Sequence, residues 1–146
     1  MPRASLFSGG KLFIAFKLLY QPPWNERLTV YDRDLYNYLR SVAGGDDYGS
    51  SFRKKATMAA DTGVSVRQIA VSRQRLSRWG LLVPLLRFNK GHQSSNHYVL
   101  FDPDNPYSRD KREALEALVS ELILKDGPEW WYQIPKEIDE IEAGLD

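Results

Sequence analysis

The sequence of 146 residues contains no cysteine and only two histidines. Without thiols the chain forms no disulfide and no thiolate metal site, and we expect a reducing compartment. The longest apolar runs, around Leu12–Leu19 and Leu81–Leu86, are too short to span a bilayer. Near the N-terminus, Gly9 and Gly10 interrupt the apolar stretch that a signal peptide needs. We therefore expect a cytoplasmic protein without a membrane partner.

Residues with catalytic or metal-binding chemistry are also scarce. His92 and His97 lie in an expected hairpin with no acid nearby, so neither a metal site nor a Ser/His/Asp triad is predicted. The segment Ser8–Lys11 lacks the first glycine and the final Ser/Thr of a phosphate-binding loop. Four acids around a short terminal segment are typical of a solvated face: Glu137, Asp139, Glu140 and Glu142. We expect no enzymatic activity, no cofactor and no metal.

The formal net charge of +1 conceals an asymmetry along the chain. Residues 52–97 carry nine Lys/Arg against one acid, Asp61, which gives +8, whereas residues 98–146 give −8. A basic middle and an acidic tail point to a polyanionic partner. Two ordinary solvated faces explain the same charges equally well, so charge alone does not identify the partner.

Hydrophobic residues form 42% and charged residues 27% of the chain, which is typical of a globular protein. Apolar periodicity, capping residues and glycines predict helices over about 32–43, 52–62, 66–79 and 108–125, and a short acidic helix from near residue 135. Their predicted N-caps are Asp32, Ser51, Ser65 and Ser108. Strands are expected over 81–88 and 96–101 with a polar loop between them, and Pro84 favours an edge position. The segment 11–20 fits a strand or a short buried helix.

The segment 56–82 has the features of two helices that cross closely around a tight turn. Ala59 is the small residue at the crossing, Gly63 permits a positive φ angle in the turn, and Ser65 starts the second helix. Val64 is the buried turn residue, and Ile69 and Leu76 face inward. Counting 100° per residue, the outward arc of the second helix holds Arg67, Gln68, Val71, Arg75 and Arg78. Arg and Gln are the side chains that read guanine and adenine edges in the major groove.

With Gly80-Leu81-Leu82 leading into a hairpin that closes at Ser95–Leu100, this sequence resembles a known family. Over about residues 28–101 it is similar to the winged helix-turn-helix domains of bacterial plasmid and phage replication proteins, and to small winged-helix repressors. The family usually has a leucine where Arg73 stands, so Arg73 either snorkels past the core or the register shifts there.

The resemblance implies an α+β fold that is mainly α, with a β-hairpin wing and an added C-terminal helix. It divides the chain into an N-terminal extension packing on the core (1–27), a winged helix-turn-helix domain (28–103), and a C-terminal helix with an acidic tail (104–146).

The resemblance also implies a recognition helix in the major groove and a wing, Arg87–Asn96, on phosphates or in the minor groove. Arg67 and Gln68, near the start of that helix, are the predicted base readers, and the later arginines are predicted phosphate contacts. An ordinary polar hairpin tip is an equally good interpretation of the wing residues. The predicted DNA-binding set is Lys54, Lys55, Ser65, Arg67, Gln68, Val71, Arg75, Arg78, Arg87, Lys90, His92, Gln93 and Ser94.

The predicted C-terminal helix has an apolar stripe formed by Leu115, Leu118, Val119, Leu122 and Ile123. The stripe either docks on the protein's own core beside the first helix or forms a homodimer interface, and we favour the dimer because the helix follows a completed domain. The acidic tail is expected either to recruit a protein partner or to limit non-specific DNA binding.

Together these features predict a sequence-specific double-stranded DNA-binding protein of a plasmid, phage or other mobile element, acting in replication initiation or transcriptional repression. The alternative from another class is a winged-helix adaptor that binds protein, and not DNA, through the wing or the C-terminal helix.

Overall fold

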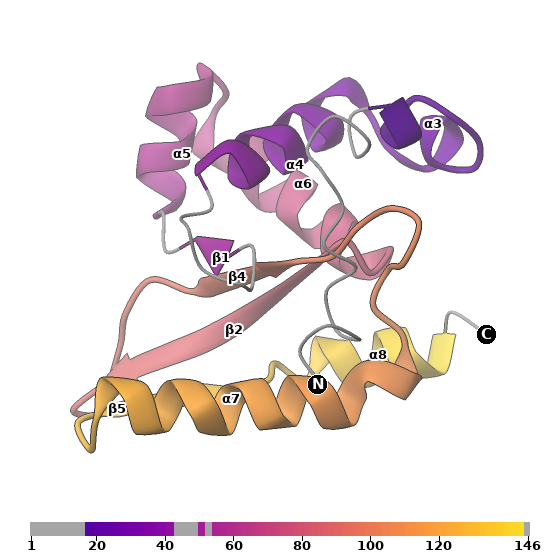
Figure 1. Cartoon of the computed structure of the whole chain (residues 1–146). Helices are drawn as coiled ribbons and strands as arrows, with labels where there is room; N and C mark the ends of the chain where they lie inside the picture. Colours follow the sequence, from indigo (N-terminus) through magenta and orange to yellow (C-terminus); the bar gives the residue numbers. More distant parts are fainter. Residues whose placement is uncertain (1–16, 43–49, 52–53, 145–146) are drawn as a thin grey trace.

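A computed structural model of the chain describes residues 17–42, 50–51 and 54–144, which form three layers. A small antiparallel sheet lies between helices α3–α6 and a second layer formed by α7 and α8 (Figure 1). The fold is α+β and mainly helical, as predicted. The helices are α3 (Trp24–Arg27), α4 (Val30–Val42), α5 (Lys55–Thr62), α6 (Val66–Arg78), the 3-10 helix η1 (Arg109–Lys111), α7 (Arg112–Asp126) and α8 (Glu137–Gly144). The strands are β1 (Ser50–Ser51), β2 (Leu82–Asn89), β3 (His92–Gln93), β4 (His97–Leu100) and β5 (Trp130–Gln133).

Helix α4 starts two residues before the predicted position because Thr29 and Asp32 bond each other's backbone. The Asp32 N–H donates to Thr29 Oγ1 at 3.2 Å, and the Thr29 N–H donates to Asp32 Oδ2 at 2.8 Å. This reciprocal pair is a capping box with Thr29 in the N-cap position, so the prediction of Asp32 as N-cap is wrong. The carboxylate of Asp32 is nevertheless fully buried at the start of the helix. The predicted end at Ala43, and most of the segment 11–20, lie outside the described residues.

The turn between α5 and α6 is formed as predicted. Gly63 has a φ angle of +74°, which lies in the left-handed region that glycine adopts without steric cost. Ser65 Oγ then accepts a hydrogen bond from the Gln68 N–H at 3.1 Å and caps α6. The direction of α6 relative to α5 is therefore fixed by two residues of the turn.

Two other predicted N-caps are wrong. Ser51 belongs to β1, and α5 begins after Lys54, whose side chain makes no capping bond. Ser108 also makes no capping bond, because its hydroxyl donates to the Asp110 carboxylate. The starts of both helices are therefore set without a side-chain cap, by backbone geometry and tertiary packing. A local sequence pattern does not predict such starts.

The strand order is β1–β4–β2–β3, and β5 also pairs with β2. The predicted hairpin is present: β2 and β4 pair antiparallel from Leu82 to Leu85 of β2. The sequence analysis did not predict β5, which pairs antiparallel with Leu86–Asn89 of β2. Because β5 covers only this outer half of β2, the inner half has no strand partner among the described residues on the side away from β4.

Pro84 lies in that inner half. The Phe101 N–H donates to Leu81 O, so in an antiparallel ladder the alternate residues Leu81 and Val83 bond β4. Pro84, which has no N–H, therefore points toward the side that β5 leaves unpaired. Pro84 thus lies at a locally unpaired position, although β2 as a whole has strand partners on both sides and is not an edge strand.

Both faces of β2 and β4 are buried, and each face belongs to a different core. One face contributes Leu82, Tyr98 and Leu100 to a core with α3–α6, which contains Leu19, Trp24, Leu28, Leu35, Tyr36, Leu39, Met58, Ile69 and Leu76. The other face contributes Val83, Leu85 and Val99 to a core with the C-terminal layer, which contains Tyr107, Leu115, Leu118, Leu122, Tyr132, Ile138 and Ile141. Side chains alternate along a strand, so a strand covered on both faces is apolar throughout.

The predicted oligomerisation stripe lies in this second core. Leu115, Leu118 and Leu122 are buried by the chain's own sheet, and Val119 and Ile123 pack beside them. These side chains are not available to a second copy, so their assignment to a dimer interface is wrong. The alternative, docking on the protein's own core, is correct, although the stripe covers the second face of the sheet rather than packing beside α4. The predicted boundary at residue 103 likewise does not divide the core. After this residue, β5 pairs with β2, and α7 packs on the face of the sheet formed by β2 and β4.

The outer half of β2 forms a three-stranded ribbon with β3 and β5. The chain reverses at Lys90–Gly91, with φ angles of +51° and +83°, in a two-residue turn where a longer loop was predicted. We call Leu86–Asn89, His92–Gln93 and Trp130–Gln133 together the distal ribbon. It extends away from α3–α6 at one end of the molecule, with α7 running alongside it (Figure 1).

Candidate nucleic-acid interface

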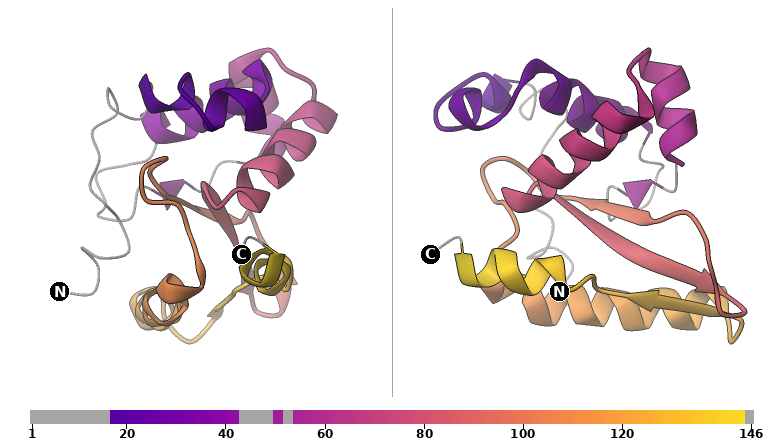
Figure 2. Two further views of the ribbon diagram at one scale, coloured as in Figure 1. Left: turned by 90° about the vertical axis from the view of Figure 1, so that its right-hand side faces the viewer. Right: turned by 180° about the vertical axis from the view of Figure 1, so that it is seen from behind.

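One face of α6 is open to solvent along the whole helix. Four of its exposed side chains repeat every three or four residues and so form one stripe: Arg67, Val71, Gln74 and Arg78. Val66, the first residue of the helix, is also exposed. Neither arginine makes an ion pair within the part of the chain that the structure describes. The right-hand view of Figure 2 shows α6 in front of the sheet, with the distal ribbon extending below it. We call these four side chains the outer face of α6.

Gln74 is a member of the outer face that the sequence analysis missed. It follows Arg67 by seven residues, and at 100° per residue this spacing returns to within about 20° of the same direction. Its position was therefore readable from the helical wheel. The amide of a Gln side chain can donate one hydrogen bond and accept another, which matches the major-groove edge of adenine.

Arg75 was predicted to contact phosphate, but the structure ties it to α4. Its Nη1 donates to Asp32 Oδ2 at 3.0 Å. The same oxygen accepts the Thr29 N–H, so one buried carboxylate both caps α4 and fixes α6 against it. Removing Arg75 would leave a buried carboxylate without its counter-charge, which is costly. Arg75 therefore has a structural role, and its predicted DNA contact stays a prediction.

Gln68 and Arg73 lie on the two flanks of the outer face. Gln68 is half-buried and its Nε2 donates to Ser72 Oγ at 3.1 Å, so it is less accessible than Arg67. Arg73 is half-buried on the side of the sheet, close to Tyr98; burial raises the pKa of the Tyr98 phenol, and the Arg73 charge opposes that shift. The snorkelling interpretation of Arg73 is correct, because its side chain passes the core and lines a surface groove.

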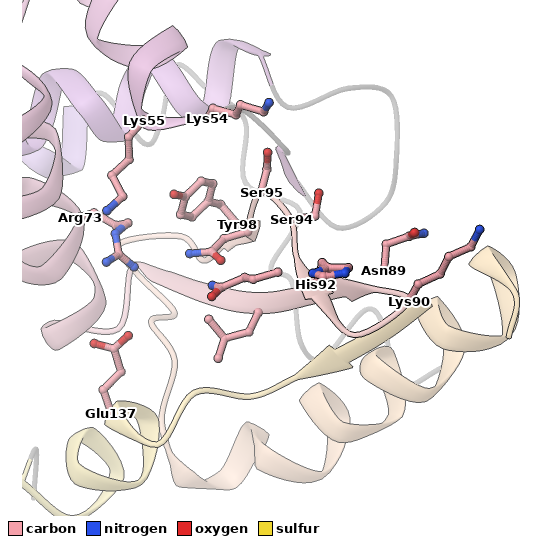
Figure 3. A pocket seen from close by; sticks show the side chains of 13 residues that line it. Lys54, Lys55, Arg73, Asn89, Lys90, His92, Ser94, Ser95, Tyr98 and Glu137 are labelled. Carbon is pink, nitrogen blue, oxygen red and sulfur yellow. The ribbon is translucent and has the colours of Figure 1, made fainter. Parts of the chain in front are cut away.

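This groove, of about 780 Å³, opens between the helical layer and the distal ribbon (Figure 3). Lys54 and Lys55, at the start of α5, and Arg73 line its helical side, and Glu137 of α8 lies near Arg73. The ribbon side is lined by Asn89, Lys90, His92, Gln93, Ser94, Ser95 and Asn96. Four cationic side chains face one carboxylate, so the groove favours an anionic ligand.

The predicted wing contacts lie at the solvent end of the distal ribbon. Lys90, His92, Gln93 and Ser94 are all exposed. The Lys90 ammonium is 3.7 Å from the Glu129 carboxylate, and both side chains are at least 60% exposed, so this surface ion pair holds Lys90 only weakly. The turn conformation of Lys90 and Gly91 presents these side chains at the outermost point of the ribbon.

Arg87 was predicted to contact DNA, but it holds the ribbon together. Its Nε donates to the Tyr132 hydroxyl and its Nη1 to Ser95 O, both at 3.2 Å, and its guanidinium lies 4.5 Å from the centre of the Trp130 ring. Burial raises the pKa of Tyr132 to about 12, helped by the hydrogen bond from its hydroxyl to the Asp126 carboxylate. Arg87 therefore joins β2 to β5, and its predicted DNA contact stays a prediction.

Other chemistry finds little support in the described residues. No three or more His, Asp or Glu side chains gather there to hold a metal ion. His97 is buried with its ring edge-on to Tyr132 at 5.9 Å, far from the exposed His92 at the end of the ribbon. No helix among residues 17–42 and 54–144 has the length and apolar character to cross a bilayer.

Arg73 of α6 lines the groove, so the groove lies beside the helix that carries the outer face (Figure 3). Neither a protein-family model, nor a curated protein, nor a solved structure matches this chain. The chain's own side chains therefore provide the basis for assigning a function.

Proposed function

We propose that the protein binds double-stranded DNA sequence-specifically through a winged helix-turn-helix, with α6 in the major groove. The order of elements supports this: α4, β1, α5, a tight turn and α6 precede a hairpin in which β4 lies between β1 and β2. In helix-turn-helix proteins the second helix of the pair presents its solvent side to the major groove. The proposal includes no catalytic step.

The observation that carries the proposal is the outer face of α6. The helix Val66–Arg78 contains four arginines and no acid, whereas a merely solvated helix more often balances its charges at i and i+4. Arg67 and Gln74 match guanine and adenine edges, and the exposed Val71 between them matches a thymine methyl group.

The surrounding side chains have separate roles in this proposal. Arg78, Lys54, Lys55 and Lys90 are positioned at the periphery of the outer face and groove, where phosphates would pass. Ser65 and Gln68 fix the start of α6, and His92, Gln93 and Ser94 contact the sugar-phosphate backbone from the ribbon. Through the family resemblance, we extend the proposal to replication initiation or repression in a plasmid, phage or other mobile element.

Selection of bound duplexes from a random pool by the full chain tests the proposal. We expect one enriched motif, bound with an affinity that falls with salt; if about six phosphates are neutralised, the logarithmic salt slope is about −5. The variant Arg78→Glu should no longer retain duplex DNA. Lys125 is an exposed cation on α7, and the control variant Lys125→Glu should retain DNA as the wild type does. A homodimer would enrich two half-sites at fixed spacing.

An unenriched pool together with no salt-dependent duplex binding at low salt would contradict the proposal. If, in addition, Arg78→Glu binds a protein partner as tightly as the wild type does, the adaptor function is favoured instead.

A further inference from the structure

The edge strand β5 places a large aromatic side chain in solvent. Trp131 is 57% exposed, whereas its neighbour Tyr132 is buried and Trp130 is half-buried. An exposed indole leaves much apolar surface in water and is common where a protein meets a partner. The Phe88–Trp131 pair in the β2–β5 register gives this indole an aromatic neighbour on the same face of the ribbon.

That face of the ribbon is continuous with the groove. Leu86 lines the groove, and Phe88 lies two residues further along β2, so both side chains point to the same side of the sheet. Trp131 is opposite Phe88 and shares its face, while Arg87 and Tyr132 point to the C-terminal layer. Trp131 therefore lies on the side of the sheet that carries α6.

The surroundings of Trp131 combine aromatic and cationic side chains. A second hollow, of about 630 Å³, is lined by Phe88, Lys90, Gly91, Trp131 and Gln133, with Pro128, Glu129 and Trp130. Apolar side chains beside cations are typical of surfaces that contact the minor groove of a duplex, because the cation attracts phosphate while the apolar side chain packs against sugars and base edges. The patch continues the basic groove toward the end of the ribbon.

The ribbon is also long enough to reach a second groove of a duplex. From Leu82, at the base of β2, to Phe88 is about 20 Å at 3.3 Å per residue. Half a turn of B-DNA, which separates a major groove from the next minor groove, is about 17 Å. With α6 in one groove, a ribbon of this length can reach the neighbouring groove.

We propose that Trp131, backed by Phe88, packs against deoxyribose and base edges in the minor groove beside the major groove that α6 enters. This inference rests on the proposed DNA binding. It adds a second apolar contact, from a strand outside the β2–β4 hairpin, to an interface in which Val71 is otherwise the apolar side chain. Because no charge is involved, the contact strengthens binding without changing the number of phosphates neutralised.

Binding of the full chain to its selected duplex, measured with Trp131→Ala, Trp131→Phe and Leu124→Ala, tests the inference. Leu124 is an 84% exposed apolar residue of α7 on the opposite layer, so it is the matched control. We expect Trp131→Ala to weaken binding at least about fivefold with an unchanged salt slope, Trp131→Phe to retain most of the affinity, and Leu124→Ala to have no effect. Replacing guanine by hypoxanthine removes only the minor-groove amino group, and should alter wild-type binding at one position but not Trp131→Ala binding.

If Trp131→Ala binds as tightly as the wild type while Arg78→Glu does not bind, the inference is wrong and the proposed function stands. In that case a protein partner is the better occupant of the Trp131 surface. If the wild type binds no duplex, the proposed function fails and the inference fails with it.

Discussion

The two helical layers on either side of the sheet bury similar apolar stripes and expose opposite charges. In the layer of α4–α6, the outer face of α6 presents Arg67, Gln74 and Arg78. In the other layer, the exposed side chains of α7 and α8 include the carboxylates Glu113, Glu116, Glu121, Asp139 and Glu140. The asymmetry of +8 in residues 52–97 against −8 in residues 98–146 is therefore an asymmetry between two sides of one molecule.

This comparison separates stability from recognition. Each layer completes one core of the same sheet, so neither layer is dispensable for folding. The basic layer and the ribbon gather cations that attract a polyanion, whereas the mostly acidic layer would repel one and so keep the duplex on a single side. Variants in the two layers should consequently fail in different ways.

The largest effect is expected from the stripe on α7. Leu118→Ala should cost about 2–5 kcal/mol of unfolding free energy, because it leaves a cavity in the second core. Urea denaturation measures this loss, and Leu124→Ala on the exposed side of α7 should cost less than about 0.5 kcal/mol. A folded Leu118→Ala protein of unchanged stability but altered oligomeric state would instead place the stripe at a dimer interface.

The next effect concerns the place where the two layers meet. Gly80, with a φ angle of +78°, lies so close to the backbone that an added Cβ would be 2.6 Å from Tyr107 O. Gly63 has a similar φ of +74° but open space around it. Gly80→Ala should therefore cost about 3 kcal/mol or more, and Gly63→Ala only about 1–2 kcal/mol. Equal losses in thermal denaturation would show that the close approach at Tyr107 is unimportant.

Arg75 and Arg78 offer a matched comparison within α6. Arg75→Ala leaves the buried Asp32 carboxylate unpaired and should cost about 2 kcal/mol of stability. Arg78→Ala should leave stability within about 0.5 kcal/mol but lower DNA affinity and reduce the salt slope by about one. Denaturation measures the stability of both variants, and duplex titration measures their DNA affinity. If Arg75→Ala lost affinity and Arg78→Ala lost stability, Arg75 would be the DNA contact and Arg78 the structural residue.

A smaller effect is expected at alkaline pH in the ribbon. The pKa of Tyr132 is raised from 10.0 to about 12 by burial, so the folded protein retains a proton that the unfolded chain loses. The corresponding stability is fully present below pH 10 and is lost as the pH rises through 12. Tyr132→Phe should therefore lose less stability than the wild type between pH 9 and 12, in urea titrations at each pH. Parallel losses would mean that Tyr132 ionises equally easily in both states.

The elements that local patterns determine were predictable. Gly63 and Ser65 set the turn and the start of α6 through φ preference and a capping bond to the next turn of the helix, both of which act within a few residues. The β2–β4 hairpin was predictable for the same reason.

The elements that depend on distant partners were not. β5 is a strand because it pairs with β2, more than 40 residues earlier, and Arg75 is structural because Asp32 lies on another helix. One signal was available: the uninterrupted apolar residues of Leu82–Leu86 and Tyr98–Phe101 indicate strands buried on both faces. That pattern requires a second covering layer, and the stripe of α7 was the obvious candidate for it.

The proposal that α6 reads DNA bases is tested most directly at Arg67. The binding of wild type and Arg67→Ala should be compared on the selected duplex, on duplexes changed at one position at a time, and on random duplex. We predict that Arg67→Ala costs about 1–3 kcal/mol on the selected duplex, costs much less on random duplex, and removes the preference at one position. An equal loss on every duplex would contradict base reading by the outer face of α6.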